Sequence, residues 1–210
     1  MPVCLPRPES TMDPDEKGRL FCRYVVDRVS LSGLDFSGVS VANIDLRGAD
    51  LRGITLANGR LDHLDLEGAV MTGSDLSGVQ MSQARLVDVD LRNAVMYRAH
   101  LESVVAVGAD MRGAMLNGAR LQYANLQKSD LSGAMLCDSN IQRGRLRFAC
   151  LAGADLCGAD LRWAELLWAN LLGVRVNQET IDRSHWSDAE LSHLMTQGMK
   201  IVDEQADFSD

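Results

Sequence analysis

The side chains that could carry chemistry are scattered along this chain rather than grouped in motifs. Its four histidines lie in separate stretches, and the sequence holds no phosphate-binding loop, dinucleotide-binding fingerprint or nucleophile elbow. Cys137 and Cys157 are twenty residues apart, whereas Cys4, Cys22 and Cys150 are isolated. This spacing favours reduced cysteines over a zinc site or a disulfide framework. We therefore expect no catalytic residue, no cofactor and no bound metal.

Length and composition limit the architecture that could position a site. The 210 residues suffice for one domain with short appendages. Aromatic residues make up only 5% of the chain, so small side chains must fill most of the core. The net charge of -8 argues against a basic nucleic-acid-binding protein. No apolar run has the length of a membrane span, and the N-terminal stretch lacks a secretory signal, which predicts a cytoplasmic protein without a membrane partner.

An apolar residue recurs at every fifth position from Phe21 to Val176. The position two residues before it is most often alanine, and the position two residues after it holds 14 of the 18 glycines. A period of five fits neither a helix nor an extended strand, so the chain must turn after each five-residue unit. Four units would complete a square coil of about twenty residues, and stacked coils would pair their backbones at a spacing of about 4.8 Å. The repeat predicts about eight such coils.

Several segments repeat one consensus: GADLRG at 48–53, GADMRGAMLNGARL at 108–121 and GADLCGADLRWAEL at 153–166. They resemble the A(D/N)LxG consensus of the pentapeptide-repeat family, and the resemblance covers about 155 residues. It implies an all-β solenoid, a right-handed quadrilateral β-helix, which we place over residues 20–178. This fold agrees with the geometry argued from the five-residue period.

The two ends of the chain depart from the repeat. Residues 1–19 predict an irregular leader in which Asp13 and Pro14 could start a short helix, in competition with strand entry near Leu20. Residues 187–190 (SDAE) form a capping box and predict a helix within a C-terminal cap over 179–202. Residues 203–210 are predicted to be an acidic, mobile tail. The apolar residues expected to contact this cap or a second subunit are Trp163, Leu167, Trp168, Leu172, Trp186, Leu191, Leu194 and Met195.

One group of outward apolar residues is a candidate partner surface. Val95, Met115 and Met135 occupy the same offset in three successive coils, and Tyr97 stands beside them. Contiguous apolar side chains on the outside of a soluble rod suggest a docking surface for a partner or a second copy. Tight local packing beneath a layer of side chains is the alternative.

The sequence supports two functions. The first is a non-enzymatic protein–protein interaction scaffold with an unidentified partner. The second is implied by the family resemblance, because quinolone-resistance members bind DNA gyrase or a related type II topoisomerase as DNA mimics. In that case acidic residues would stand in for phosphates without direct nucleic-acid binding, and the C-terminal coils would form a homodimer. These acids are Asp35, Asp45, Asp50, Asp65 and Asp75.

Charge counts against the DNA-mimic hypothesis. Residues 20–176 hold 17 acidic and 16 basic residues, so the repeat region is almost neutral. Duplex DNA of the same length would carry roughly 22 negative charges at one charge per about 1.7 Å. Where Asp and Arg stand two positions apart, as in Asp90 and Arg92, exposed ion pairs are the simpler interpretation.

Overall fold

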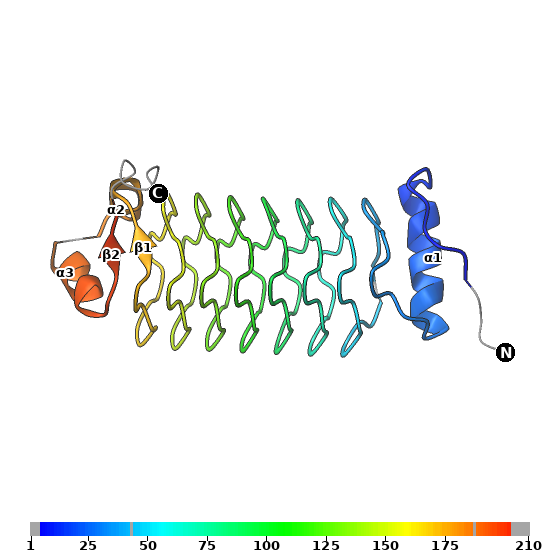
Figure 1. The fold of residues 1–210 in the computed structure, drawn as a ribbon, viewed down its shortest axis with the longest axis horizontal. Coiled ribbons are helices and arrows are strands. Elements are labelled where there is room, and N and C mark those ends of the chain that lie inside the picture. The colour runs from blue at the N-terminus through cyan, green and yellow to red at the C-terminus, as the bar shows by residue number, and fades with distance from the viewer. Residues whose placement is uncertain (1–4, 43, 187, 203–210) are drawn as a thin grey trace, which may run out of the picture.

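The computed structural model describes residues 5–42, 44–186 and 188–202, which form an elongated stack of coils with helices at both ends (Figure 1). One helix lies at the N-terminal end, and two helices with a two-stranded parallel sheet lie at the C-terminal end. The elements are α1 (Pro14–Val26), β1 (Arg175–Val176), α2 (Gln178–Ser184), α3 (Asp188–Thr196) and β2 (Lys200–Ile201). Within the described residues, no helix is long and apolar enough to cross a membrane.

Each coil of the stack takes twenty residues. Parallel bridges join residues twenty positions apart, from the pair Asp35 and Thr55 to the pair Asp155 and Arg175. The backbone bonds run between neighbouring coils, as in the 2.7 Å bond from the Leu121 N–H to the Asn140 carbonyl. This pairing satisfies the backbone groups that would otherwise be buried without partners.

The five-residue period fixes which side chains enter the core. Leu121 and Ala119 are fully buried, and most residues at the same offsets are buried along the stack. Two positions after each central residue the backbone turns a corner with a positive φ, +71° at Gly108. Glycine adopts this conformation at little cost, whereas Tyr123 and Arg143 adopt it at φ values of +61° and +56°. These two corners therefore carry large outward side chains.

The N-terminal boundary of the repeat differs from the prediction. Helix α1 continues to Val26, so the expected start of the β-helix at residue 20 is wrong. The Asp13 carboxylate accepts a 2.8 Å bond from the Glu16 N–H and caps the helix. Phe21 is buried, as the five-residue period predicts, but it belongs to helix α1 and not to a coil of the β-helix. Its ring meets Phe36 edge-on at 5.1 Å, so α1 covers the open end of the first coils.

The C-terminal end of the stack is covered by α2 and β2. The Thr180 hydroxyl donates to the Leu156 carbonyl at 2.8 Å, and the Ser184 hydroxyl accepts from the Leu161 N–H at 3.2 Å. Strand β2 pairs in parallel with β1. Helix α2 was not predicted. Residue 187 of the capping box and the predicted mobile tail 203–210 lie outside the described residues, as does Cys4.

Candidate interaction surfaces

The structure brings the four residues of the candidate partner surface together on one side of the rod. We call Val95, Tyr97, Met115 and Met135 the methionine surface. Bridges place Met115 between Val95 and Met135 in successive coils. The Tyr97 hydroxyl lies 3.2 Å from the Met115 sulfur, and the Tyr97 and Met135 side chains are each 40% exposed. The proximity follows the sequence spacing, and its role in docking stays a prediction.

Polar groups border the methionine surface along the same side. Asp75 bridges to Val95 at one end, and Asp155 bridges to Met135 at the other. Burial, reinforced by the Asp155 carboxylate, raises the pKa of the Cys137 thiol to about 11. Burial likewise raises the pKa of Cys157 to about 12, with Asp155 again contributing. Both thiols are therefore protonated at neutral pH, which makes them poor nucleophiles.

The five acids proposed as phosphate mimics do not form one row. Asp35 and Asp75 both bridge to Thr55 on the side that carries the methionine surface. Asp45 and Asp65 bridge to each other on a second side, and Asp50 bridges to Val70 on a third. The structure thus distributes these carboxylates around the rod instead of aligning them as phosphates align along a DNA strand.

Arginines hold three of these acids in ion pairs. Arg47 binds Asp45 at 2.6 Å, and Arg52 binds Asp50 at 2.7 Å. Side-chain hydrogen bonds from Arg47, then the Arg47 backbone N–H, lower the pKa of Asp45 to about 2. Asp65 lies 3.7 Å from Arg85. A guanidinium therefore lies beside each of these three carboxylates, and Arg85 also binds Glu67 at 2.7 Å.

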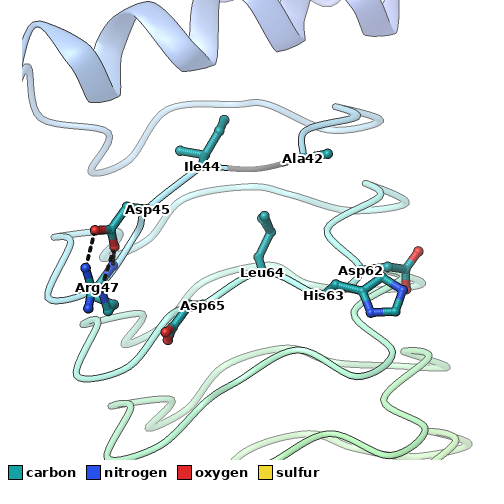
Figure 2. Close-up of a pocket in the computed structure, with 8 residues that line it drawn as sticks. All are labelled: Ala42, Ile44, Asp45, Arg47, Asp62, His63, Leu64 and Asp65. Carbon is teal, nitrogen blue, oxygen red and sulfur yellow. Dashed lines mark hydrogen bonds and ion pairs between the residues drawn. The ribbon is translucent and has the colours of Figure 1, made fainter.

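A shallow pocket near the N-terminal end of the stack has the Asp45–Arg47 ion pair in its lining (Figure 2). In it, Asp45 faces Arg47, whereas Asp62 accepts a 2.8 Å bond from the Ser82 N–H. No group of three potential metal ligands occurs among the described residues. Both carboxylates thus have structural partners, and we assign the pocket no catalytic role. Its lining residues are Ala42, Ile44, Asp45, Arg47, Asp62, His63, Leu64 and Asp65.

The predicted cap residues divide into two groups. Leu194 is buried, and Leu191 and Trp186 pack partly buried against the core, whereas Met195 is exposed. The outward residues of the last coils are open to solvent in the single chain, so the terminal helix does not cover them. Contact with a second subunit stays a prediction. These open residues are Trp163, Leu167, Trp168 and Leu172.

A sequence model of pentapeptide repeats matches the chain in eight copies over residues 26–53, 49–86, 84–122, 116–147 and 145–178. The chain belongs to the pentapeptide-repeat family. The fold of this pentapeptide-repeat protein is accordingly the right-handed β-helix of its structural neighbours. Family membership assigns no catalytic activity to it.

Two solved pentapeptide-repeat structures illustrate the likeness. HetL from the cyanobacterium Nostoc sp. strain PCC 7120, a protein involved in heterocyst differentiation regulation, shares 22% identity, with a TM-score of 0.57 over 79% of this chain and 82% of HetL. QnrB1, a plasmid-mediated fluoroquinolone resistance protein, shares 20% identity, with a TM-score of 0.40 over 84% of this chain and 87% of QnrB1. No curated protein matches the sequence. The likeness to HetL shows the fold and leaves the function open.

A ladder of ion pairs runs along the side of this pentapeptide-repeat protein that also carries Asp50. Arg92 lies 2.7 Å from Asp90 and 3.7 Å from Asp110 in the next coil. Arg112 repeats the arrangement, at 2.7 Å from Asp110 and 3.9 Å from Asp130. The expected neutralised ladder is therefore present, and its pairs link successive coils.

The ladder predicts a loss of stability in acid. Hydrogen bonds from Arg92 are the main reason that the pKa of Asp90 falls to about 2, and Arg112 lowers that of Asp110. A carboxyl with a lower pKa in the folded state stabilises the fold above its ordinary pKa of about 4, and this contribution disappears as the pH falls from about 4 to about 2. We expect the urea midpoint to drop across this interval. In Asp90→Asn/Asp110→Asn the drop should be smaller, and an unchanged drop would contradict the assignment.

Sequence reasoning missed one cluster at the C-terminal end of the rod. Tyr123, Arg143 and Trp163 stand at one corner at twenty-residue spacing, and Phe148 and Trp168 stand at a neighbouring corner. The signal was in the sequence, because the residue two positions after each centre is usually glycine, and large side chains replace it here. Their interactions are described below.

Proposed function

We propose that this pentapeptide-repeat protein is a non-enzymatic protein–protein interaction scaffold that binds its partner through the methionine surface. The observation that carries the proposal is the contiguity of outward apolar side chains over three coils, two of them 40% exposed. Methionine side chains are flexible and polarisable and fit varied apolar partners. Tyrosine beside them is a residue type enriched in binding hot spots.

The rigidity of the coil stack supports this role. Backbone hydrogen bonds join each coil to its neighbours on all four sides, so the methionine surface is built before a partner arrives. A preorganised surface loses less conformational entropy on binding than a flexible one. The proposal also places the protein in the cytoplasm, where the free thiols of Cys137, Cys150 and Cys157 would stay reduced.

The gyrase hypothesis receives less support from this geometry. The acids lie on three sides, Arg47 and Arg52 offset the charge of two of them, and Arg85 is shared between Asp65 and Glu67. A DNA mimic needs uncompensated negative charge in a row. The interaction scaffold is therefore the function that we put forward.

Replacing both methionines with glutamate should abolish binding to the physiological partner. Met115→Glu/Met135→Glu adds two charges that a partner would have to desolvate in an apolar contact, so recovery of the specific partner should fall by about tenfold or more. Quantitative affinity capture from native lysate with the tagged full-length protein measures this recovery.

The matched control keeps the charge and moves it to another side. Gln80→Glu/Asn140→Glu adds the same two charges at the same position of the five-residue unit, and it should leave recovery unchanged. Circular dichroism verifies that both variants fold. Equal recovery by the wild type and the methionine variant would remove the methionine surface from the proposed function.

A further inference from the structure

Three arginines of one coil carry charge that no acid of the described residues neutralises. Arg143, Arg145 and Arg147 alternate along a single stretch, and none of them forms an ion pair with a described residue. Lys128, at a corner of the preceding coil, likewise has no carboxylate partner in the described part of the chain. Arg92 and Arg112, by contrast, each meet two aspartates.

Neutral groups hold these arginines in place. The Arg143 guanidinium lies 5.8 Å from the Tyr123 ring centre and 5.1 Å from that of Trp163, so the two rings fix it from adjacent coils. In the amide orientation that satisfies both side chains, the Gln127 oxygen accepts from Arg145 Nε at 3.0 Å and from Nη2 at 2.7 Å. Aromatic rings and an amide orient a guanidinium without cancelling its charge.

A second set of rings borders the arginines at the neighbouring corner. Phe148 and Trp168 stack with their centres 4.9 Å apart and their planes 21° apart, and the Arg147 guanidinium lies 5.2 Å from the Trp168 ring centre. Trp163 is 65% exposed and Phe148 is 51% exposed, although both are large aromatic residues. Arg143 and Arg145 are exposed as well, whereas Arg147 is half-buried and its Nε is buried.

We call this set the arginine–aromatic surface, and its net charge is positive. Lys128 and the three arginines contribute four positive charges, and Glu165, the bridge partner of Arg145, contributes one negative charge. Glu165 forms no ion pair within the described chain. The result is a local charge of about +3 on a protein whose sequence carries a net charge of -8. The members are Tyr123, Lys128, Arg143, Arg145, Arg147, Phe148, Trp163, Glu165 and Trp168.

We propose that the arginine–aromatic surface binds a carboxylate-rich segment of a partner protein. Charge complementarity selects the occupant, because oriented guanidinium groups bind carboxylates with charge-assisted hydrogen bonds. Trp, Tyr and Arg are the residue types that dominate binding hot spots. The site is separate from the methionine surface, so it extends the proposed scaffold with a second contact of opposite chemistry.

The stacking pattern disfavours single-stranded nucleic acid as the occupant. Such ligands bind by placing bases on open aromatic faces. Here Arg143 lies between Tyr123 and Trp163, and Phe148 lies against Trp168. Bases would have to displace these contacts, whereas a carboxylate needs only guanidinium N–H groups other than the Arg145 Nε and Nη2 that Gln127 already engages.

Fluorescence anisotropy with a labelled twelve-residue poly-glutamate peptide tests the proposal on the full chain. We expect wild-type protein to bind the peptide in the micromolar range, and Arg143→Glu/Arg145→Glu to weaken binding by about tenfold or more. Arg60→Glu/Arg98→Glu is the matched control. Arg60 occupies a bridge position like Arg145, Arg98 occupies a positive-φ corner like Arg143, and neither has an acid partner among the described residues. This control should change binding by less than about twofold.

The outcomes separate clearly. No peptide binding by wild-type protein at about 1 mM, or equal weakening in the control, would overturn the proposal. Tighter binding of a twelve-nucleotide oligothymidylate than of the peptide would assign the surface to nucleic acid instead. If the glutamate variant fails to fold, Arg143→Gln/Arg145→Gln must show the weakening. Because Met115→Glu/Met135→Glu should bind the peptide normally, failure here leaves the methionine surface untouched.

Discussion

Replacing Phe36 with alanine should remove about 3–5 kcal/mol from the free energy of unfolding. Phe36 is fully buried, and its ring meets the Phe21 and Tyr24 rings of α1 edge-on at 5.1 Å and 5.8 Å. The substitution therefore creates a cavity and also removes aromatic contacts that join the helix to the coils. Urea denaturation followed by circular dichroism measures the loss.

The same variant should release α1 from the stack. A polar contact also joins the helix to the coils, because the Lys17 ammonium donates to the Ser37 carbonyl at 2.8 Å. Released residues should become sensitive to limited proteolysis before the coils unfold. Phe148→Ala is the matched control, because Phe148 is half exposed and stacks on Trp168 alone. It should cost about 0.5–1.5 kcal/mol. Equal losses in the two variants would show that α1 is not held by Phe36.

The sequence predicted the coil of this protein because one physical constraint repeats along it. A chain that turns after every five residues must send the central residue and the one two positions before it inward, and Leu121 and Ala119 follow this rule. The start of helix α1 at Asp13 and Pro14 was one of the predicted alternatives, but its continuation to Val26 was missed because Phe21 satisfies two patterns. It continues the period of five, and together with Tyr24 it also forms one face of a helix. Only packing against Phe36 decides between the two.

The candidate surfaces were predictable to different degrees. The contiguity of Met115 and Met135 follows from the period alone, because residues twenty positions apart must stack. The arginine–aromatic surface needed a further step. Along the ladder each arginine follows an aspartate by two positions, as Arg92 follows Asp90, and the pair neutralises itself. At Arg145 and Arg147 the residue two positions earlier is another arginine, so this local neutralisation is absent.

The five acidic residues were named from the sequence but were not placed on particular sides of the coil. Asp45, Asp50 and Asp75 lie in one stretch of the sequence, but each five-residue unit turns the chain to a new side of the coil. Carboxylates ten residues apart therefore lie on opposite sides of a four-sided coil, as the bridges of Asp35 and Asp45 on separate ladders show. A row of like charges would require acids at intervals of twenty.

Leu121→Ala should destabilise the middle of the stack by about 2–5 kcal/mol. Leu121 is fully buried between Leu101 and Ile141, the residues at the same position of the adjacent coils. The backbone bonds that hold coils at a spacing of about 4.8 Å prevent those neighbours from closing the cavity. We therefore expect a loss in the upper part of this range.

The control for Leu121→Ala is a leucine of the same β-helix whose side chain faces outward. Leu167 is 52% exposed, so Leu167→Ala should change the free energy of unfolding by less than about 1 kcal/mol. A solenoid transmits stability between adjacent repeats, so the cavity at Leu121 should weaken both halves of the rod together. Hydrogen exchange should accelerate on both sides of the substituted coil. Acceleration on one side only would show that the rod consists of two independent folding units. It would contradict the expectation that one continuous core of leucine and alanine stabilises the whole stack.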